Sequence, residues 1–100
     1  MSARARSQAP SPSQAEALAK AVADDGCLVR WPGGFWTYRS APISERGVPG
    51  WSTGTQTVQA CEARGWLERA REFAEDWRDT RRVTEAGRQA LRQTAEQQRP

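Results

Sequence analysis

A glycine that ends one helix and leads directly into a strand constrains this fold most. The sequence from Thr53 begins TGTQ, the pattern of a capping box, and apolar residues then recur at helical spacing. Gly65 follows, and glycine readily adopts the left-handed conformation that lets a chain leave a helix. Residues 66–70, directly after this stop, are interpreted as a strand. We therefore predict a helix over 54–64, capped by Thr53, and a strand over 66–70 immediately after it.

The following segment predicts a return strand and a last helix. Residues 81–83 can pair with 66–70, across a highly charged connection at 71–80 that is either an open wing or holds a helical turn. Thr84 is a good N-cap, and the helix after it has an apolar side. Gly87 lies inside that helix, so we expect a bulky group, with Trp66 as the candidate, to pack closely against it.

The first half of the chain predicts a helix and a hairpin. A helix over 13–24 has two alternative capping boxes, Ser11 with Gln14 or Ser13 with Glu16, and Gly26 is its expected stop. Residues 27–31 and 35–39 are rich in β-branched and aromatic side chains, and Pro32-Gly33 between them predicts a type II turn. An irregular loop follows over 40–52, with Ile43, Val48 or Trp51 as its expected anchor.

Composition predicts one non-catalytic domain. We expect residues 1–11, which include Arg4 and Arg6, to form a disordered arm and residues 12–97 to fold as one domain. With no His and only two Cys, the chain lacks the ligands of a structural zinc site and most acid–base or nucleophile arrangements. We therefore expect no enzyme activity, no metal and no cofactor.

The two cysteines and the lack of long apolar runs bear on location. Without a secretory signal or a run of the ~20 apolar residues that cross a bilayer, the expected location is the cytoplasm. Cys27 and Cys61 are then more typical of buried thiols than of a disulfide, although their pairing stays open. The net charge of +3 and the pI near 9.5 are mildly basic, which favours a partner without naming it.

The strings CEARG at 61–65 and TEAGR at 84–88 resemble motifs in bacterial winged-helix regulators of the MarR and PadR kind. The resemblance covers about half of the chain. It implies an α+β fold with the order helix, hairpin, loop, recognition-type helix, hairpin wing and C-terminal helix. It also implies a transcriptional regulator of bacterial or phage type that binds double-stranded DNA, and a homodimer is the expected form.

The resemblance further implies which residues contact DNA. Helix 54–64 would lie in the major groove, with Gln56 and Gln59 on its outward face reading base edges. The wing at 66–83 would hold the phosphate backbone, although its arginines lie among acidic residues that form local ion pairs. The implied contacts are Thr53, Thr55, Gln56, Gln59, Arg64, Arg78, Arg81 and Arg82.

The first half departs from the winged-helix pattern and leaves alternatives open. Where those regulators have a second helix, this chain has either a short helix near 44–48 or a hairpin in its place. We expect Trp36 and Trp66 to lie in the core. The alternative function is a protein-interaction module on the same scaffold, with an exposed surface that holds Trp31, Trp51 or Trp77.

Overall fold

The computed structural model describes residues 9–70 and 79–97 of the chain. The predictions for residues 1–8 of the N-terminal arm, for the open wing or helical turn at 71–78, and for Trp77 and Arg78 therefore lie outside the described residues. The described part is an α+β fold with three helices and one antiparallel sheet of five strands. Its elements are α2 (Pro12–Ala23), β1 (Cys27–Trp31), β2 (Phe35–Tyr38), β3 (Thr53–Gly54), α3 (Thr55–Ala63), β4 (Leu67–Arg69), β5 (Thr80–Val83) and α4 (Glu85–Gln97).

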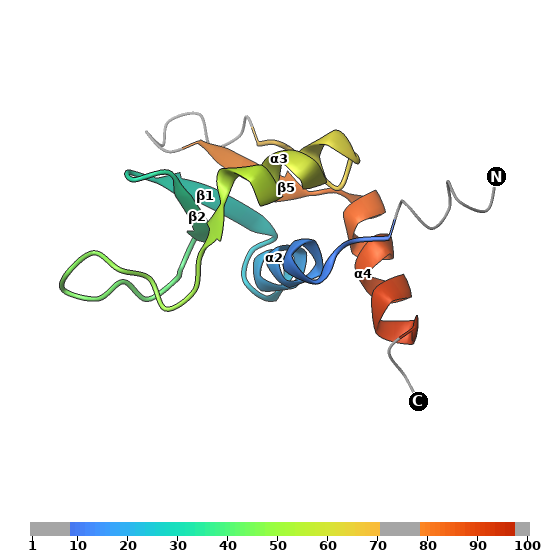
Figure 1. Cartoon of the computed structure of the whole chain (residues 1–100), viewed down its shortest axis with the longest axis horizontal. Coiled ribbons are helices and arrows are strands. Elements are labelled where there is room, and N and C mark those ends of the chain that lie inside the picture. Colours follow the sequence, from blue (N-terminus) through green and yellow to red (C-terminus); the bar gives the residue numbers. More distant parts are fainter. Residues whose placement is uncertain (1–8, 71–78, 98–100) are drawn as a thin grey trace.

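The sheet joins the two predicted hairpins through their first and last strands (Figure 1). Its strand order is β3-β2-β1-β5-β4. Both hairpins are confirmed: β1 pairs with β2, with Leu28 opposite Tyr38, and β4 pairs with β5. The pairing of β1 with β5, with Leu28 also opposite Arg81, could not be read from local sequence. It unites the two halves of the chain in one sheet.

The first helix is confirmed, and it begins and ends one residue before the predicted bounds of 13–24. Of the two alternative capping boxes, the one at Ser11 forms: its hydroxyl accepts a hydrogen bond from the Gln14 backbone N–H, and the Gln14 side chain accepts one from the Ser11 backbone. Gly26 has a positive φ of 86° beyond the end of the helix. The buried residues Ala17, Leu18 and Ala21 give α2 its packing face.

The start of α3 differs from the prediction, whereas its end agrees. Thr53 is not the N-cap, because its backbone pairs with Trp36 in β3 and the cap position passes to Gly54. At the other end, Gly65 has a φ of 78°. Its N–H donates to Glu62 O, and the N–H of Trp66 donates to Cys61 O, which together form a Schellman motif. The chain therefore turns from α3 into β4 without a longer loop.

The last helix is capped by Thr84, as predicted. The Thr84 hydroxyl accepts a hydrogen bond from the N–H of Gly87 at 3.1 Å. Gly87 does allow a close approach, but by the backbone of Trp66 rather than by its ring. A Cβ at position 87 would lie 2.5 Å from the Trp66 carbonyl oxygen and 3.0 Å from a Val83 methyl carbon.

The core lies between one face of the sheet and the helices. Residues that pair across antiparallel strands share a face, and strand residues alternate between faces. Leu28, Trp36, Leu67 and Val83 therefore point to the same side, where they pack with residues of α2, α3 and α4. Trp36 and Trp66 are both buried, as predicted.

The 40–52 segment projects from the body of the molecule (Figure 1). Residues 44–48 form a turn rather than a helix, so a hairpin stands where the winged-helix pattern has its second helix. The Ser44 hydroxyl accepts hydrogen bonds from the N–H groups of Arg46 and Val48. Of the three expected anchors, Trp51 packs against the core, whereas Val48 is exposed. Among the described residues, no helix is long and apolar enough to span a membrane.

Candidate nucleic-acid interface

Helix α3 presents a polar face to solvent. Gln56, Gln59 and Ala63 are exposed, while Val58 and Cys61 are buried against the core. The spacing of three and four residues along the helix places these two sets on opposite sides. The predicted outward orientation of Gln56 and Gln59 is therefore confirmed.

The carboxylate of α3 is bound by an arginine from the sheet. Glu62 Oε1 lies 3.3 Å from Arg81 Nε, and Asp79 Oδ1 lies 3.0 Å from Arg81 Nη1. The Arg81 guanidinium also stacks over the Trp36 ring, with its central carbon 5.3 Å from the ring centroid. Arg81 therefore pairs with Glu62 from beneath the helix and shares its charge with Asp79.

This position of Arg81 corrects the prediction that it lies on an exposed wing. Arg81 is only 7% exposed, because β5 pairs with β1 and directs the side chain toward the face of the sheet that carries α3. Arg82 points to the opposite face and is half-buried. Its Nη2 lies 2.8 Å from Glu68 Oε2, so the predicted local ion pairs form for both arginines.

The two threonines at the start of α3 make contacts within the fold. Thr53 is half-buried and paired in β3. The Thr55 hydroxyl accepts a hydrogen bond from Trp36 Nε1 and donates one to the carbonyl oxygen of Gly34, each at 3.2 Å. Both predicted contact residues therefore have structural roles, and Thr55 ties the first turn of α3 to the β1–β2 hairpin.

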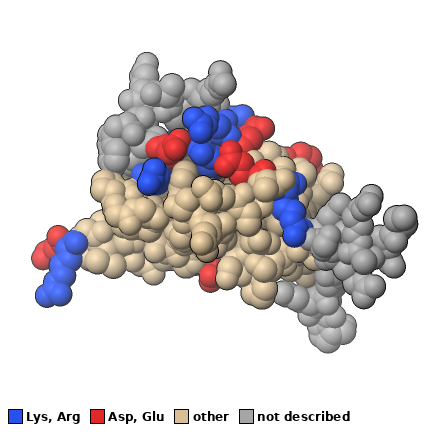
Figure 2. Space-filling view, turned by 45° about the horizontal axis from the view of Figure 1, so that its top comes forward, with Lys and Arg blue, Asp and Glu red and all other residues tan. Residues whose placement is uncertain are grey.

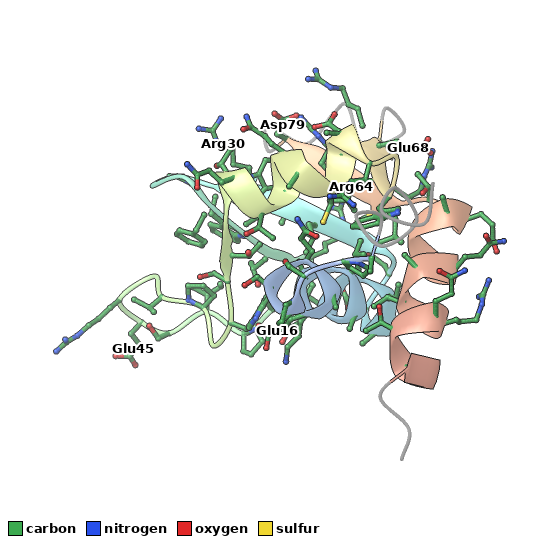
Figure 3. The ribbon with its side chains drawn as sticks, turned by 45° about the vertical axis from the view of Figure 1, so that its right-hand side comes forward. Glu16, Arg30, Glu45, Arg64, Glu68 and Asp79 are labelled. Atoms are coloured by element: carbon green, nitrogen blue, oxygen red, sulfur yellow. The ribbon has the colours of Figure 1, made fainter. Side chains whose placement is uncertain are left out.

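Two exposed arginines lie near the ends of α3 (Figure 3). Arg64, a predicted contact residue, follows the last turn, and its guanidinium lies 5.4 Å from the centroid of the Trp66 ring. Arg30 on β1 lies near the first turn, because its partner in the sheet is Trp36, which bonds to Thr55. Sequence reasoning missed Arg30, since its proximity to α3 depends on the packing of β2 against the helix.

Charges of both signs gather on the side of the molecule that carries α3. Figure 2 shows the blue Lys and Arg side chains of this side directly beside red Asp and Glu side chains. The ion pairs of Arg81 and Arg82 are consistent with this mixture. Among the arginines of this side, Arg30 and Arg64 are exposed and next to α3.

The tryptophans and cysteines form no separate site in the described part of the chain. Trp31 and Trp51 are half-buried, and Trp51 stacks on Tyr38 with the ring centroids 6.5 Å apart. Cys27 and Cys61 are both buried free thiols. Burial raises the pKa of Cys61 to about 11. Within residues 9–70 and 79–97, no three His, Cys, Asp or Glu side chains come together as metal ligands.

Comparison with known proteins leaves the function to be argued from this geometry. No protein family matches the chain, and no curated protein or solved structure matches it.

Proposed function

We propose that this protein binds double-stranded DNA through α3, on a winged-helix-like scaffold, and acts as a transcriptional regulator. One observation carries the proposal. The exposed face of α3 offers two amides and a small side chain, and the carboxylate of the helix, Glu62, is turned toward Arg81. A helix whose carboxylate is paired with an arginine repels a polyanion less than a helix whose carboxylate has no cationic partner.

The side chains on this face suit base recognition. A glutamine amide can donate a hydrogen bond to N7 of adenine and accept one from its N6 amino group, which is a common contact in the major groove. Gln56 and Gln59 are one turn apart, so both amides can meet the same groove wall. Ala63, further along, leaves room for the helix to lie close to the bases.

The arrangement around α3 also supports this function. The helix is followed directly by the β4–β5 hairpin and then by α4, which is the order that the resemblance to winged-helix regulators implies. In such proteins the recognition helix enters the major groove and the hairpin lies along the backbone. Arg64 is exposed at the end of α3, where it can contact phosphate.

The test is a fluorescence anisotropy titration of a pool of random-sequence duplexes at several salt concentrations. We expect binding at about 50 mM salt that weakens steeply as salt rises. The double change Gln56→Ala/Gln59→Ala should reduce selection of a preferred sequence from the pool. Arg64→Ala should weaken binding to all sequences and lower the salt slope by about 1.

The matched control is Arg46→Ala, which removes an exposed arginine from the projecting 40–52 segment. This variant should bind like the original protein. Arg81 is unsuitable as a first test, because its removal from a buried position would also destabilise the fold. Absence of binding at low salt, or an equal effect of Arg46→Ala and Arg64→Ala, would refute the proposal.

A further inference from the structure

The turn between β1 and β2 is fastened to the first turn of α3. Thr55, the first residue of α3, donates its hydroxyl hydrogen to the carbonyl oxygen of Gly34 at 3.2 Å. The hydroxyl oxygen of Thr55 also accepts a hydrogen bond from Trp36 Nε1 at 3.2 Å. Backbone pairing adds to these bonds, because Phe35 lies opposite Gly54 in the sheet. The turn and the helix are therefore held in one fixed relative position.

The turn itself has a defined shape. The N–H of Gly34 donates to the carbonyl oxygen of Trp31 at 3.2 Å, which closes a four-residue turn over Trp31–Gly34. Gly33 has a φ of 104°, as the third position of a type II turn requires, and Pro32 fixes the second. A rigid turn binds with a smaller entropic cost than a loop that must become ordered.

The turn projects past the start of α3 and lacks acidic residues. Figures 1 and 3 both show it extending beyond the first turn of the helix. Pro32 and Gly33 are exposed, as is Arg30 immediately before the turn. The segment 26–38 contains no Asp or Glu. Arg30 is the one charged residue of this segment. The acidic residue next to it across the sheet is Asp79, whose backbone carbonyl accepts the Arg30 N–H at 2.8 Å and whose carboxylate is bound by Arg81 at 3.0 Å.

We infer that the β1–β2 turn, with Arg30, is a second contact of the same interface and reaches the phosphate backbone beside the groove that α3 enters. This inference rests on the proposed function and names its second contact. The hairpin then takes the place of the second helix of the winged-helix pattern as the element that positions α3 on the duplex. Arg30 supplies the cation, and the small, exposed Gly33 lets the backbone of the turn come close to phosphate.

The test places opposite charges at one exposed position of the turn. Pro32→Lys and Pro32→Glu each remove the proline and differ from each other in charge, with Pro32→Ser as the neutral reference. Relative to Pro32→Ser, we expect Pro32→Lys to bind random duplex about three- to tenfold more tightly and Pro32→Glu to bind weaker by a similar factor. Arg30→Gln should lower the salt slope by about 1 without changing the preferred sequence.

The control repeats the substitutions at Val48, which is 59% exposed on the projecting 40–52 segment. Val48→Lys and Val48→Glu should bind DNA equally well, and circular dichroism melts should show every variant folded. If the Pro32 variants behave like the Val48 variants, or if Lys and Glu at position 32 change the affinity in the same direction, the inference is wrong. Dependence on Gln56 and Gln59 would then still support the proposed function, whereas absence of all binding would overturn both.

Discussion

The hydroxyl of Thr84 donates a hydrogen bond to the carbonyl oxygen of Gly65 at 2.6 Å. The same hydroxyl accepts from the N–H of Gly87, so one oxygen joins the end of α3 to the start of α4. The backbone reinforces this link, because the N–H of Thr84 donates to Trp66 O at 2.9 Å. The exposed face of α3 is thus held at its C-terminal end by Thr84, and at its N-terminal end by Thr55.

Replacing Thr84 tests this link. Thr84→Val keeps the shape of the side chain and removes the hydroxyl, so we expect a loss of about 1–2 kcal/mol in the free energy of unfolding. Thr84→Ser retains the hydroxyl and should lose less than about 0.5 kcal/mol. Urea denaturation measures both variants. Equal stability of the two would show that the hydroxyl does not carry the link.

Gly87→Ala should destabilise the protein although alanine is the better helix former. The new Cβ would lie 2.5 Å from the Trp66 carbonyl oxygen, which is backbone and already bound by Thr84. Overpacking of this kind costs about 1–3 kcal/mol, which exceeds the gain of about 1 kcal/mol in helix propensity. Gly50→Ala is the control, because a Cβ there meets open space. A thermal melt in which Gly87→Ala is the more stable protein would contradict the packing described.

The ion pair between Arg81 and Glu62 predicts that the stability of the protein and its affinity for DNA can be changed independently. Arg81→Met should lower the free energy of unfolding by about 1–3 kcal/mol, since it removes a buried side chain with two ion pairs. It should also weaken DNA binding, because Glu62 is then uncompensated beside the duplex. Adding Glu62→Gln should restore affinity but not stability. Affinity that stays low in the double variant would indicate that Arg81 contacts DNA itself.

The buried thiol of Cys61 predicts that the free energy of unfolding decreases at alkaline pH. Burial raises its pKa from 9.0 to about 11, so the folded state favours the thiol over the thiolate. The resulting stability is fully present below pH 9 and is lost as the pH rises through about 11. At pH 8 the thiol should resist a disulfide reagent in the folded protein and react rapidly in urea. Fast reaction of Cys61 without urea would contradict its burial.

Junctions between elements were predictable because they depend on neighbouring residues. The cap at Ser11, the stop at Gly65 and the cap at Thr84 each involve hydrogen bonds over five residues or fewer. The cap at Thr53 was predicted wrongly for the opposite reason. Its backbone is held in β3 by Trp36, which lies in a distant part of the sequence, and this pairing moves the cap to Gly54.

In the candidate site, too, some features follow from local sequence and others depend on distant contacts. The outward position of Gln56 and Gln59 follows from helical periodicity, a local property that is independent of what packs beneath the helix. The approach to Gly87 was predicted as close, but the group that approaches is the Trp66 backbone. Which group approaches Gly87 depends on the path of the backbone between β4 and α4, and the size of a side chain does not determine that path.

The sequence by itself determined the order of the elements and which face of α3 is polar, since both rest on short-range spacing. Only the tertiary structure decided which arginines face solvent. Arg81 and Arg82 are adjacent in a strand and must point to opposite faces, but the sequence does not say which face is covered. Pairing of β5 with β1 places Arg81 beneath α3, where it pairs with Glu62 and Asp79, and Arg30 is exposed near the start of the helix.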